Sequence, residues 1–237
     1  HVIDSFRNDL YPGYKTDGGI DPPLRSQFTL LEAALYELGV SVWPMVEYEA
    51  DDALAAAATA AVAAGVHKVA ILTPDKDLAQ CVVDPRVVQI DRRRETIFDE
   101  AAVRAKFGVP PSLIPDYLAL VGDQADGFPG IPGFGPKSAA AVLCHFGGIE
   151  TIPDDANAWK GAAVRGADRL AANLAAQRDD AMLFRRLATL ACEGPEVGSP
   201  DEWRWQGPRS AFAGWAERLG GSNWIERVDR LAAQRLA

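Results

Sequence analysis

The alternation of short apolar runs with helical segments in the first part of the chain most constrains its fold. Residues 67–73, HKVAILT, form an apolar run typical of a buried strand, and residues 86–92, RVVQIDR, form a second one. An alanine-rich segment at 49–65 precedes the first run and is predicted as a helix that ends at Gly65. This order predicts an α/β fold with a mostly parallel sheet flanked by helices on both faces.

Further elements are predicted around these runs. Residues 26–39 place Phe28, Leu31 and Leu35 at helical spacing, and a glycine ends that helix. The apolar residues 40–47, VSVWPMVE, predict a short strand, and PDKDLAQ at 74–80 begins a short helix.

The pattern changes to helices after residue 99. Helical segments are predicted over 99–108, 110–122, 136–147, 168–191 and 203–237, the last with a loop at Gly220–Gly221. We therefore predict two parts, an α/β core over 1–108 and a helical half over 109–237, with no disordered linker between them.

Composition excludes several classes of protein. The three cysteines, Cys81, Cys144 and Cys192, lie far apart and form no CxxC pair, which excludes a zinc knuckle and fits a reducing cytoplasm. No run of 18 apolar residues is present, and the first residues carry no apolar signal segment, so we expect no membrane partner. The net charge of −9 taken alone speaks against a nucleic-acid binder. If some of the acidic residues bind divalent cations, however, those cations offset part of this negative charge where a nucleic acid would bind.

Seven acidic residues lie at the ends of predicted elements. They are Glu49, Asp51, Asp52, Asp75, Asp77, Asp123 and Asp126. Because the carboxyl ends of parallel strands share one edge of a sheet, we expect the acids at 49–52 and 75–77 to meet there, with the last pair brought in by the helical half. Uncompensated carboxylates would repel one another, and divalent cations would remove that cost. Oxygen-only ligands favour Mg²⁺ or Mn²⁺, and two such ions can hold the attacking and leaving oxygens of a phosphodiester.

Each acidic motif has an ordinary alternative when it is taken alone. Acids in the first turn of a helix stabilise its dipole, so EADD at 49–52 fits helix capping. PDKD at 74–77 fits a turn followed by helix-starting acids, and GDQAD at 122–126 fits a capped loop. The placement of all three motifs at successive element ends favours a metal site over these alternatives.

A glycine-rich turn separates the helices predicted at 110–122 and 136–147. It contains Gly130, Gly133 and Gly135, with Lys137 and Ser138 at the start of the second helix. Bare backbone N–H groups at such a helix start can hold a phosphate, to which Lys137 adds a charge and Ser138 a hydroxyl. The GxxGxG spacing and the preceding helix disfavour a dinucleotide site, and a plain turn is the simpler alternative. A helical hairpin that holds a DNA backbone without reading bases fits better.

Several motifs together resemble the 5′-nuclease, or flap endonuclease, superfamily, which includes stand-alone bacterial 5′–3′ exonucleases and the N-terminal nuclease domain of DNA polymerase I. The resemblance covers nearly the whole chain, through SFRNDLYPGYK, EADDALA, TPDKDLAQ and KFGVPPSLIPDYLALVGDQADGFPGIPGFGPKSA. It implies a PIN-like nuclease core and a helix-three-turn-helix in the helical half.

The resemblance also implies roles for the residues that match the family's motifs. The seven acids would ligate metal or lie directly behind the ligands. Arg7 and Lys15 lie in the segment that resembles the helical gateway, where cations meet the scissile phosphate. The glycine turn would hold the duplex backbone, with a K⁺ ion bound through carbonyl oxygens.

Two departures from the family pattern bear on these roles. Many relatives carry a further arginine after the YK pair, whereas Gly18 stands at that position here. The family also begins with strands that carry two more aspartate ligands, and we expect those strands to precede His1. Asp4 lies too close to Phe6 to replace them and fits a solvated loop acid.

Taken together, the motifs and the resemblance predict a metal-dependent 5′–3′ exonuclease and flap endonuclease that hydrolyses DNA phosphodiesters in replication and repair. We expect two or more Mg²⁺ or Mn²⁺ ions and a DNA partner with a flap, a nick or a 5′ end. We also expect a monomer in the bacterial cytoplasm, associated with the nucleoid. Two alternatives stay open: a PIN-like ribonuclease, which also clusters acids on an α/β sheet, and a structure-specific DNA-binding module without catalysis.

Overall fold

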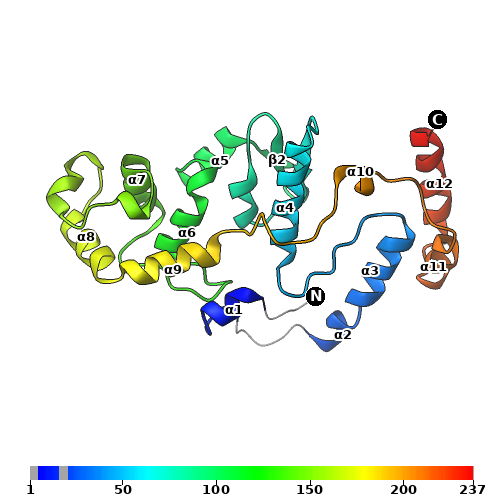
Figure 1. Ribbon diagram of the computed structural model, residues 1–237, viewed down its shortest axis with the longest axis horizontal. Helices are drawn as coiled ribbons and strands as arrows, with labels where there is room; N and C mark the ends of the chain where they lie inside the picture. The colour runs from blue at the N-terminus through cyan, green and yellow to red at the C-terminus, as the bar shows by residue number, and fades with distance from the viewer. Residues whose placement is uncertain (1–4, 16–20, 237) are drawn as a thin grey trace.

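The structure is a computed structural model that describes residues 5–15 and 21–236 of the 237-residue chain. Its elements form an elongated arrangement, with a small sheet and α4 (Ala50–Ala63) between two helical ends (Figure 1). Helices α7 (Pro136–Phe146) and α8 (Ala167–Ala176) lie at one end. Helices α11 (Phe212–Arg218) and α12 (Ser222–Leu236) lie at the other.

A three-stranded mixed sheet forms the centre of the first half. Strands β1 (Val69–Ile71) and β2 (Val87–Asp91) pair in parallel, with Val69 opposite Val87. Strand β3 (Thr96–Phe98) then pairs antiparallel to β2, with Gln89 opposite Phe98. The parallel pair confirms the two strands predicted from the apolar runs, and the α/β fold class is confirmed. Strand β3 was not predicted, because its three residues carry too short a pattern.

The strand predicted at residues 40–47 is wrong. This segment has no strand partner among the described residues and runs as an extended loop between α3 (Phe28–Glu37) and α4. Two of its apolar residues, Trp43 and Met45, are partly buried by side-chain packing, whereas Val40 and Val46 are exposed. Trp43 packs edge-to-face against Trp203, with ring centroids 5.3 Å apart, and Met45 packs against the same cluster of buried residues.

Helix α4 covers the sheet closely because its buried face is built from alanine. Ala55 and Ala58 pack in one cluster with Ile71 of β1, with Val87 of β2 and with Leu78, which lies between the two strands in the sequence. Alanine is the best helix former and carries a short side chain, so the helix forms readily and approaches the strands closely. The first turn of α4, which carries Asp51 and Asp52, is thereby fixed in place.

The second half is helical and is organised around α6 (Ile114–Val121). Seven of the eight residues of α6 are buried, and the helix packs against α9 (Arg178–Ala188). The stretch predicted as helical over 168–191 consists of two helices, α8 and α9, which meet at Gln177. Phe128, which follows α6, stacks on Phe184 of α9 with ring centroids 5.4 Å apart.

Shorter elements complete the chain. Helix α5 runs over Glu100–Phe107, and the short elements are α1 (Phe6–Leu10), α2 (Pro22–Arg25), α10 (Pro200–Trp203) and the 3-10 turns η1 (Asp77–Cys81), η2 (Pro111–Leu113), η3 (Ile149–Thr151) and η4 (Ala156–Gly161).

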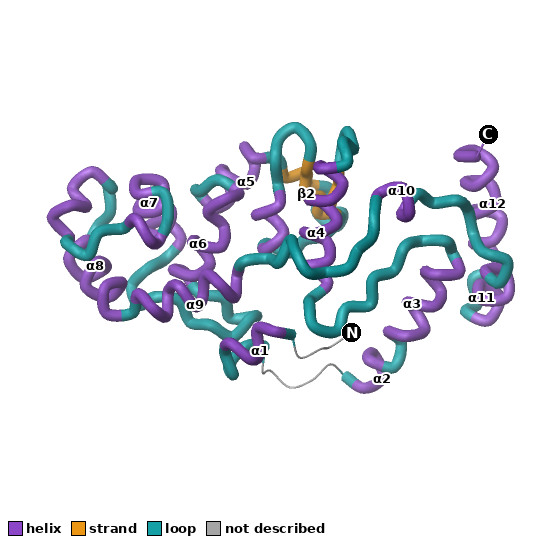
Figure 2. The backbone as a smooth tube through the Cα atoms, viewed as in Figure 1, coloured by secondary structure: helices purple, strands orange, loops and turns teal. Residues whose placement is uncertain are grey.

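Two long loops join the α3, α11 and α12 end to the centre and run side by side (Figure 2). Backbone and side-chain hydrogen bonds connect them: Arg209 N donates to Glu37 O at 2.8 Å, and Trp205 Nε1 donates to Leu38 O at 2.7 Å. The tail was predicted to be helical from residue 203, but residues 204–211 form a loop between α10 and α11. The helices over 212–236 and the break at Gly220–Gly221 are as predicted. Throughout the described ranges, no helix has both the length and the apolar character that crossing a bilayer requires.

Candidate active site

Three buried carboxylates converge where the two halves of the chain meet. Asp77, Asp123 and Asp126 each offer an oxygen atom, and these atoms all lie within 4.8 Å of one another. Asp77 begins η1, after the short loop at 72–76 that follows β1, whereas Asp123 and Asp126 follow the end of α6. Side chains that are 46 or more residues apart in sequence therefore share one small volume, which we call the carboxylate cluster.

A tight turn holds the two carboxylates that follow α6. Asp123 N donates to Phe128 O at 2.8 Å, and Phe128 N donates back to Asp123 O at 3.1 Å. Within this turn, Gly127 has a φ of +85°, and a Cβ there would lie 2.2 Å from Gly13 O. The turn therefore packs closely against the segment that follows α1, where Lys15 N donates to Asp126 O at 3.1 Å. The glycine at 127 is required because a side chain would push these two segments apart.

The electrostatics of the carboxylate cluster favour the binding of cations. Burial, and then the nearby Asp126 carboxylate, raise the pKa of Asp77 to about 8, while Lys76 opposes the shift. Burial likewise raises the pKa of Asp126, and Lys15 opposes it. Asp77 Oδ1 is buried and accepts no hydrogen bond from any described residue. A buried, unsatisfied oxygen among like charges is costly, and a cation bound there would remove the cost.

The donor set fits a divalent metal ion. All three candidate ligands are carboxylates, without histidine or cysteine among them. Hard divalent cations such as Mg²⁺ and Mn²⁺ prefer oxygen ligands of this kind. The cluster therefore supports the use of a divalent metal by this chain.

Two lysines flank the carboxylate cluster, and the sequence analysis missed one of them. Lys76 Nζ lies 2.6 Å from Asp123 Oδ2. On the other side, Lys15 Nζ lies 2.8 Å from Glu49 Oε1 and 3.5 Å from Asp126 Oδ1. Lys15 was predicted from the resemblance, whereas Lys76 was overlooked even though it stands between two predicted acids. Its position in PDKD was the available signal.

Glu49, Asp51 and Asp75 form a rim beside the carboxylate cluster. Glu49 accepts a hydrogen bond from the Tyr14 hydroxyl at 2.8 Å as well as the Lys15 ammonium. Burial, and then the Asp75 carboxylate, raise the pKa of Asp51 to about 6. Asp75 itself is exposed. Sequence analysis did not single out Tyr14, whose pKa is raised chiefly by burial and then by Glu49. It is 1% exposed and fixes the orientation of Glu49.

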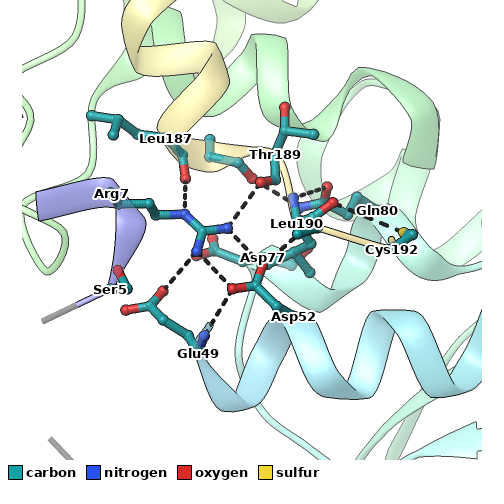
Figure 3. Close-up of polar contacts among 12 residues, drawn as sticks. Ser5, Arg7, Glu49, Asp52, Asp77, Gln80, Leu187, Thr189, Leu190 and Cys192 are labelled. Atoms are coloured by element: carbon teal, nitrogen blue, oxygen red, sulfur yellow. Dashed lines mark hydrogen bonds and ion pairs between the residues drawn. The ribbon is translucent and has the colours of Figure 1, made fainter. Parts of the chain in front are cut away.

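Arg7 and Asp52 do not face the carboxylate cluster as free groups. They form a buried pair in which Arg7 Nη1 donates to Asp52 Oδ2 and Nη2 donates to Oδ1, both at 2.7 Å (Figure 3). Arg7 Nε also donates to Leu187 O, and Nη2 to Thr189 O, at the end of α9. Asp52 in turn accepts from the backbone N–H groups of Glu49 and Ala191.

These contacts differ from the roles expected for the two residues. Arg7 was expected to meet the scissile phosphate, and Asp52 to ligate metal or to lie directly behind the ligands. Arg7 is 1% exposed and Asp52 is 0% exposed, so of these expectations only a position behind the ligands fits Asp52. Each nitrogen of the guanidinium group already donates to a protein oxygen. The pair instead ties α1, α4 and the end of α9 together. Asp4 and Gly18, the positions of the two departures from the family pattern, lie outside the described residues.

The glycine-rich turn between α6 and α7 contains glycines of two kinds. Gly130 has a φ of +72°, and a Cβ there would lie 2.4 Å from Gly122 N, so its role is internal packing. Gly133 also has a positive φ, of +88°, and a Cβ there would touch Leu170. Gly135 is different, because a Cβ at this position meets no atom within 4 Å. Its bare backbone faces open space at the start of α7.

A hollow of about 770 Å³ lies over the start of α7. Its lining includes Gly135, the exposed Lys137 and, from the loop before α8, Arg165. Ser138 also lines it, but its hydroxyl accepts from Gly135 N at 2.9 Å and donates to Gly135 O at 3.1 Å. The Ser138 hydroxyl therefore stabilises the helix start. Lys137 and Arg165 supply positive charge around the hollow, and sequence analysis missed Arg165.

Comparison with known proteins assigns both halves of the chain to one family. Residues 2–108 match the 5′-3′ exonuclease N-terminal resolvase-like domain, and residues 109–211 match the 5′-3′ exonuclease C-terminal SAM fold. DNA polymerase I of Pseudomonas aeruginosa is 33% identical over 233 residues, which is 97% of this chain and 25% of that protein. A 5′-3′ exonuclease of Aquifex aeolicus is 41% identical over 147 residues, which is 62% of this chain and 50% of that protein.

Solved structures share the fold. The T5 D15 protein crystallised with metal ions has a TM-score of 0.65 at 18% identity, covering 80% of this chain and 72% of that one. The catalytic core of Rad2 in complex with a DNA substrate has a TM-score of 0.53 at 17% identity, covering 90% of this chain and 70% of that one. The chain thus spans about a quarter to a half of the length of the two sequence relatives named above.

Proposed function

This chain belongs to the 5′-3′ exonuclease family, and on that premise we propose that it hydrolyses DNA phosphodiesters as a metal-dependent 5′–3′ exonuclease and flap endonuclease. The observation that carries the proposal is the carboxylate cluster, in which Asp77, Asp123 and Asp126 bring oxygens within 4.8 Å of one another. The names of the relatives, DNA polymerase I and 5′-3′ exonuclease, support the same chemistry.

The carboxylate cluster would hold divalent cations, which we propose are two or more Mg²⁺ or Mn²⁺ ions. Asp77, Asp123 and Asp126 would hold one ion, and the rim of Glu49, Asp51 and Asp75 would share in a second. When bound, such ions lower the pKa of water and neutralise charge on a phosphodiester. The T5 D15 protein, which has the same fold, was crystallised with metal ions, and this supports the proposal.

The remaining side chains would position the substrate and the ligands. Lys15 is 41% exposed and lies at the edge of the carboxylate cluster, where its ammonium could neutralise a phosphate oxygen as charge develops. Tyr14 would keep Glu49 oriented through its hydroxyl. Arg7 would act as a positioning residue, because its pair with Asp52 fixes the start of α4 and therefore Glu49 and Asp51.

The glycine-rich turn would hold the duplex backbone at a distance from the site of cleavage. Gly135 N already donates to Ser138 Oγ, but the open space beside Gly135 lets a ligand come close to the start of α7, where N–H groups favour anions. Lys137 and Arg165 add positive charge around the hollow. We further propose that carbonyl oxygens of the turn at 130–135 hold a K⁺ ion. The DNA partner would be a flap, a nick or a 5′-ended duplex, bound by a monomer at the nucleoid of the bacterial cytoplasm.

The two halves would divide this work between them. We propose an α/β nuclease core over 1–108 and a helical DNA-binding half over 109–237. The family descriptions support a boundary here, since one ends at residue 108 and the other begins at 109. The carboxylate cluster draws on both halves, with Asp77 from the first and Asp123 and Asp126 from the second.

A cleavage assay with matched substrates tests the proposal. A 5′-labelled DNA flap and an RNA flap of the same sequence would be incubated with Mn²⁺, with Mg²⁺ and with EDTA. We expect DNA products with either metal and none with EDTA or with Asp77→Asn. Cleavage in EDTA would contradict the metal-dependent reaction. Preferred cleavage of RNA would favour the ribonuclease, and binding of flap DNA without products would favour the non-catalytic module.

A further inference from the structure

The carboxylate cluster already contacts a positively charged side chain, that of Lys76. Lys76 Nζ lies 2.6 Å from Asp123 Oδ2 and 4.0 Å from Asp77 Oδ1. These two oxygens are buried side-chain atoms that accept no hydrogen bond of ordinary geometry within the described residues. The ammonium group therefore neutralises the oxygens that a divalent cation would use, and it does so as an ion pair without a well-directed hydrogen bond.

Lys76 can leave this position without disturbing the fold. Its side chain is 36% exposed, whereas the Asp123 side chain beside it is 3% exposed. A lysine carries a strongly hydrated ammonium on a flexible four-carbon stem, so a change of rotamer takes the charge into water. Asp123 cannot follow, because its backbone is held by two hydrogen bonds to Phe128. The carboxylates are therefore fixed, and the lysine is the movable partner.

The second lysine serves the other side of the carboxylate cluster. Lys15 Nζ pairs with Glu49 Oε1 at 2.8 Å and Asp126 Oδ1 at 3.5 Å. Its position is set by the backbone, because Lys15 N donates to Asp126 O. The backbone of Lys15 therefore stays bonded to Asp126 even if its side chain moves. Lys76, in contrast, neutralises Asp77 and Asp123 through its side chain alone.

We propose that Lys76 is an exchangeable counter-cation: its ammonium neutralises Asp77 and Asp123 in the metal-free protein and moves to solvent when a divalent cation binds between them. This inference rests on the proposed function for the existence of that cation site. The ammonium of Lys76 and a divalent cation are both positive and repel each other, so Lys76 lowers the affinity of the carboxylate cluster for metal. It also stabilises the metal-free fold, because without it the buried carboxylates repel one another.

Chemical labelling of the wild-type protein tests the exchange directly. The protein would be acetylated briefly with acetic anhydride, with and without Mn²⁺ and in the absence of DNA, and modification would be measured for each lysine by mass spectrometry. We expect Mn²⁺ to raise the labelling of Lys76 several-fold while the exposed Lys160 serves as an unchanged internal reference. Equal or lower labelling of Lys76 in saturating Mn²⁺ would overturn the inference.

Three variants supply an independent readout through metal affinity. Lys76→Met removes the charge, Lys76→Arg keeps it, and Lys160→Met makes the same charge change at an exposed site away from the cluster. By calorimetric titration we expect Lys76→Met to bind Mn²⁺ about tenfold more tightly than wild type. We expect it to melt at a lower temperature without metal, and we expect the other two variants to remain near wild type. Unchanged or weaker Mn²⁺ binding by Lys76→Met would overturn the inference.

The two proposals fail in different ways. If the wild-type protein binds no Mn²⁺ and its melting temperature does not respond to it, both the metal site and the exchange are wrong. If the wild-type protein binds Mn²⁺ but Lys76 labelling and Lys76→Met affinity do not change, the exchange alone is wrong. Should Lys76→Met fail to fold, the labelling of wild-type protein still decides the question.

Discussion

The guanidinium group of Arg7 forms a two-pronged ion pair with the Asp52 carboxylate, with both N–O distances at 2.7 Å, in the interior of the protein. The pair joins the first described helix to the start of α4 and, through Leu187 and Thr189, to the end of α9. Arg7 and Asp52 were predicted to take part in catalysis, but they connect the three segments that surround the candidate active site. Their charges neutralise each other and are absent from the surface that a substrate would meet.

Removing one partner of this pair should destabilise the protein strongly. Arg7→Met leaves the Asp52 carboxylate buried and without its charge partner, which should lower the free energy of unfolding by about 3–5 kcal/mol. The double variant Arg7→Met, Asp52→Leu should lose much less than the sum of the single variants, since it leaves no unpaired charge. Urea denaturation of the four proteins measures this difference. Additive losses would show that the pair is not coupled as the structure indicates.

Asp77 should be essential for cleavage but not for duplex binding. Asp77→Asn removes a candidate metal ligand and should lower cleavage by roughly a hundredfold or more, with little change in the affinity for flap DNA. Without metal and near neutral pH, the same variant should melt at a higher temperature than wild type, because folding no longer has to bury a carboxylate whose pKa is raised to about 8. Asp179→Asn, at an exposed position of α9, is the matched control and should change none of these quantities. A lower melting temperature for metal-free Asp77→Asn would argue for a structural role.

Asp75→Ala tests whether the rim takes part in the reaction. Asp75 is exposed, and its charge has the largest charge effect on the pKa of Asp51, so its removal should weaken the binding of a second metal ion. Asp75 Oδ1 also accepts a hydrogen bond from Asp77 N at 3.1 Å, so a thermal melt of the variant accompanies the assays. We expect cleavage to be abolished while duplex binding stays nearly intact, as measured by gel shift and flap cleavage. Full activity of the Asp75→Ala protein would remove the rim from the proposed mechanism.

The two kinds of glycine in the turn should respond differently to substitution. Gly135→Val should leave the melting temperature near wild type, because a Cβ there meets no atom within 4 Å, but should weaken duplex binding by blocking the backbone. Gly130→Ala should instead lower the free energy of unfolding by about 1–3 kcal/mol, because its φ is strained for a side chain. Thermal melts and duplex binding of both variants test this contrast. Equal duplex affinity of Gly135→Val and wild type would place the DNA elsewhere.

Lys137 should contribute affinity without sequence preference. Lys137→Ala removes one phosphate contact, so it should weaken binding similarly for all duplexes and reduce the slope of log K against log salt by about one unit. The control, Lys68→Ala, removes an exposed lysine near β1 and should leave the slope unchanged. Fluorescence anisotropy over a range of salt concentrations gives both slopes. A loss confined to particular sequences would contradict a backbone contact.

Local patterns determined the type of most elements. The apolar runs that became β1 and β2, the alanine-rich α4 and the glycine-flanked helices α5 and α7 were all predicted, because periodicity and capping act within a few residues. The same reasoning failed at 40–47, where Trp43 packs against Trp203 and the segment pairs with no strand among the described residues. Apolar character predicts burial, but the pattern of backbone pairing depends on which segments lie next to the run.

The sequence by itself determined that acidic residues would stand at the ends of a strand and two helices, and that a glycine-rich turn would follow the last pair. Only the tertiary structure decided which acids come together: Asp77, Asp123 and Asp126 share one volume, whereas Asp52 is neutralised by Arg7. The physical reason is that a carboxylate looks the same in the sequence whether its partner is a metal ion, an arginine or water. Its partner is chosen by packing between segments far apart in the chain, and Lys76, placed 2.6 Å from Asp123 by the contact between η1 and the turn after α6, was decided in the same way.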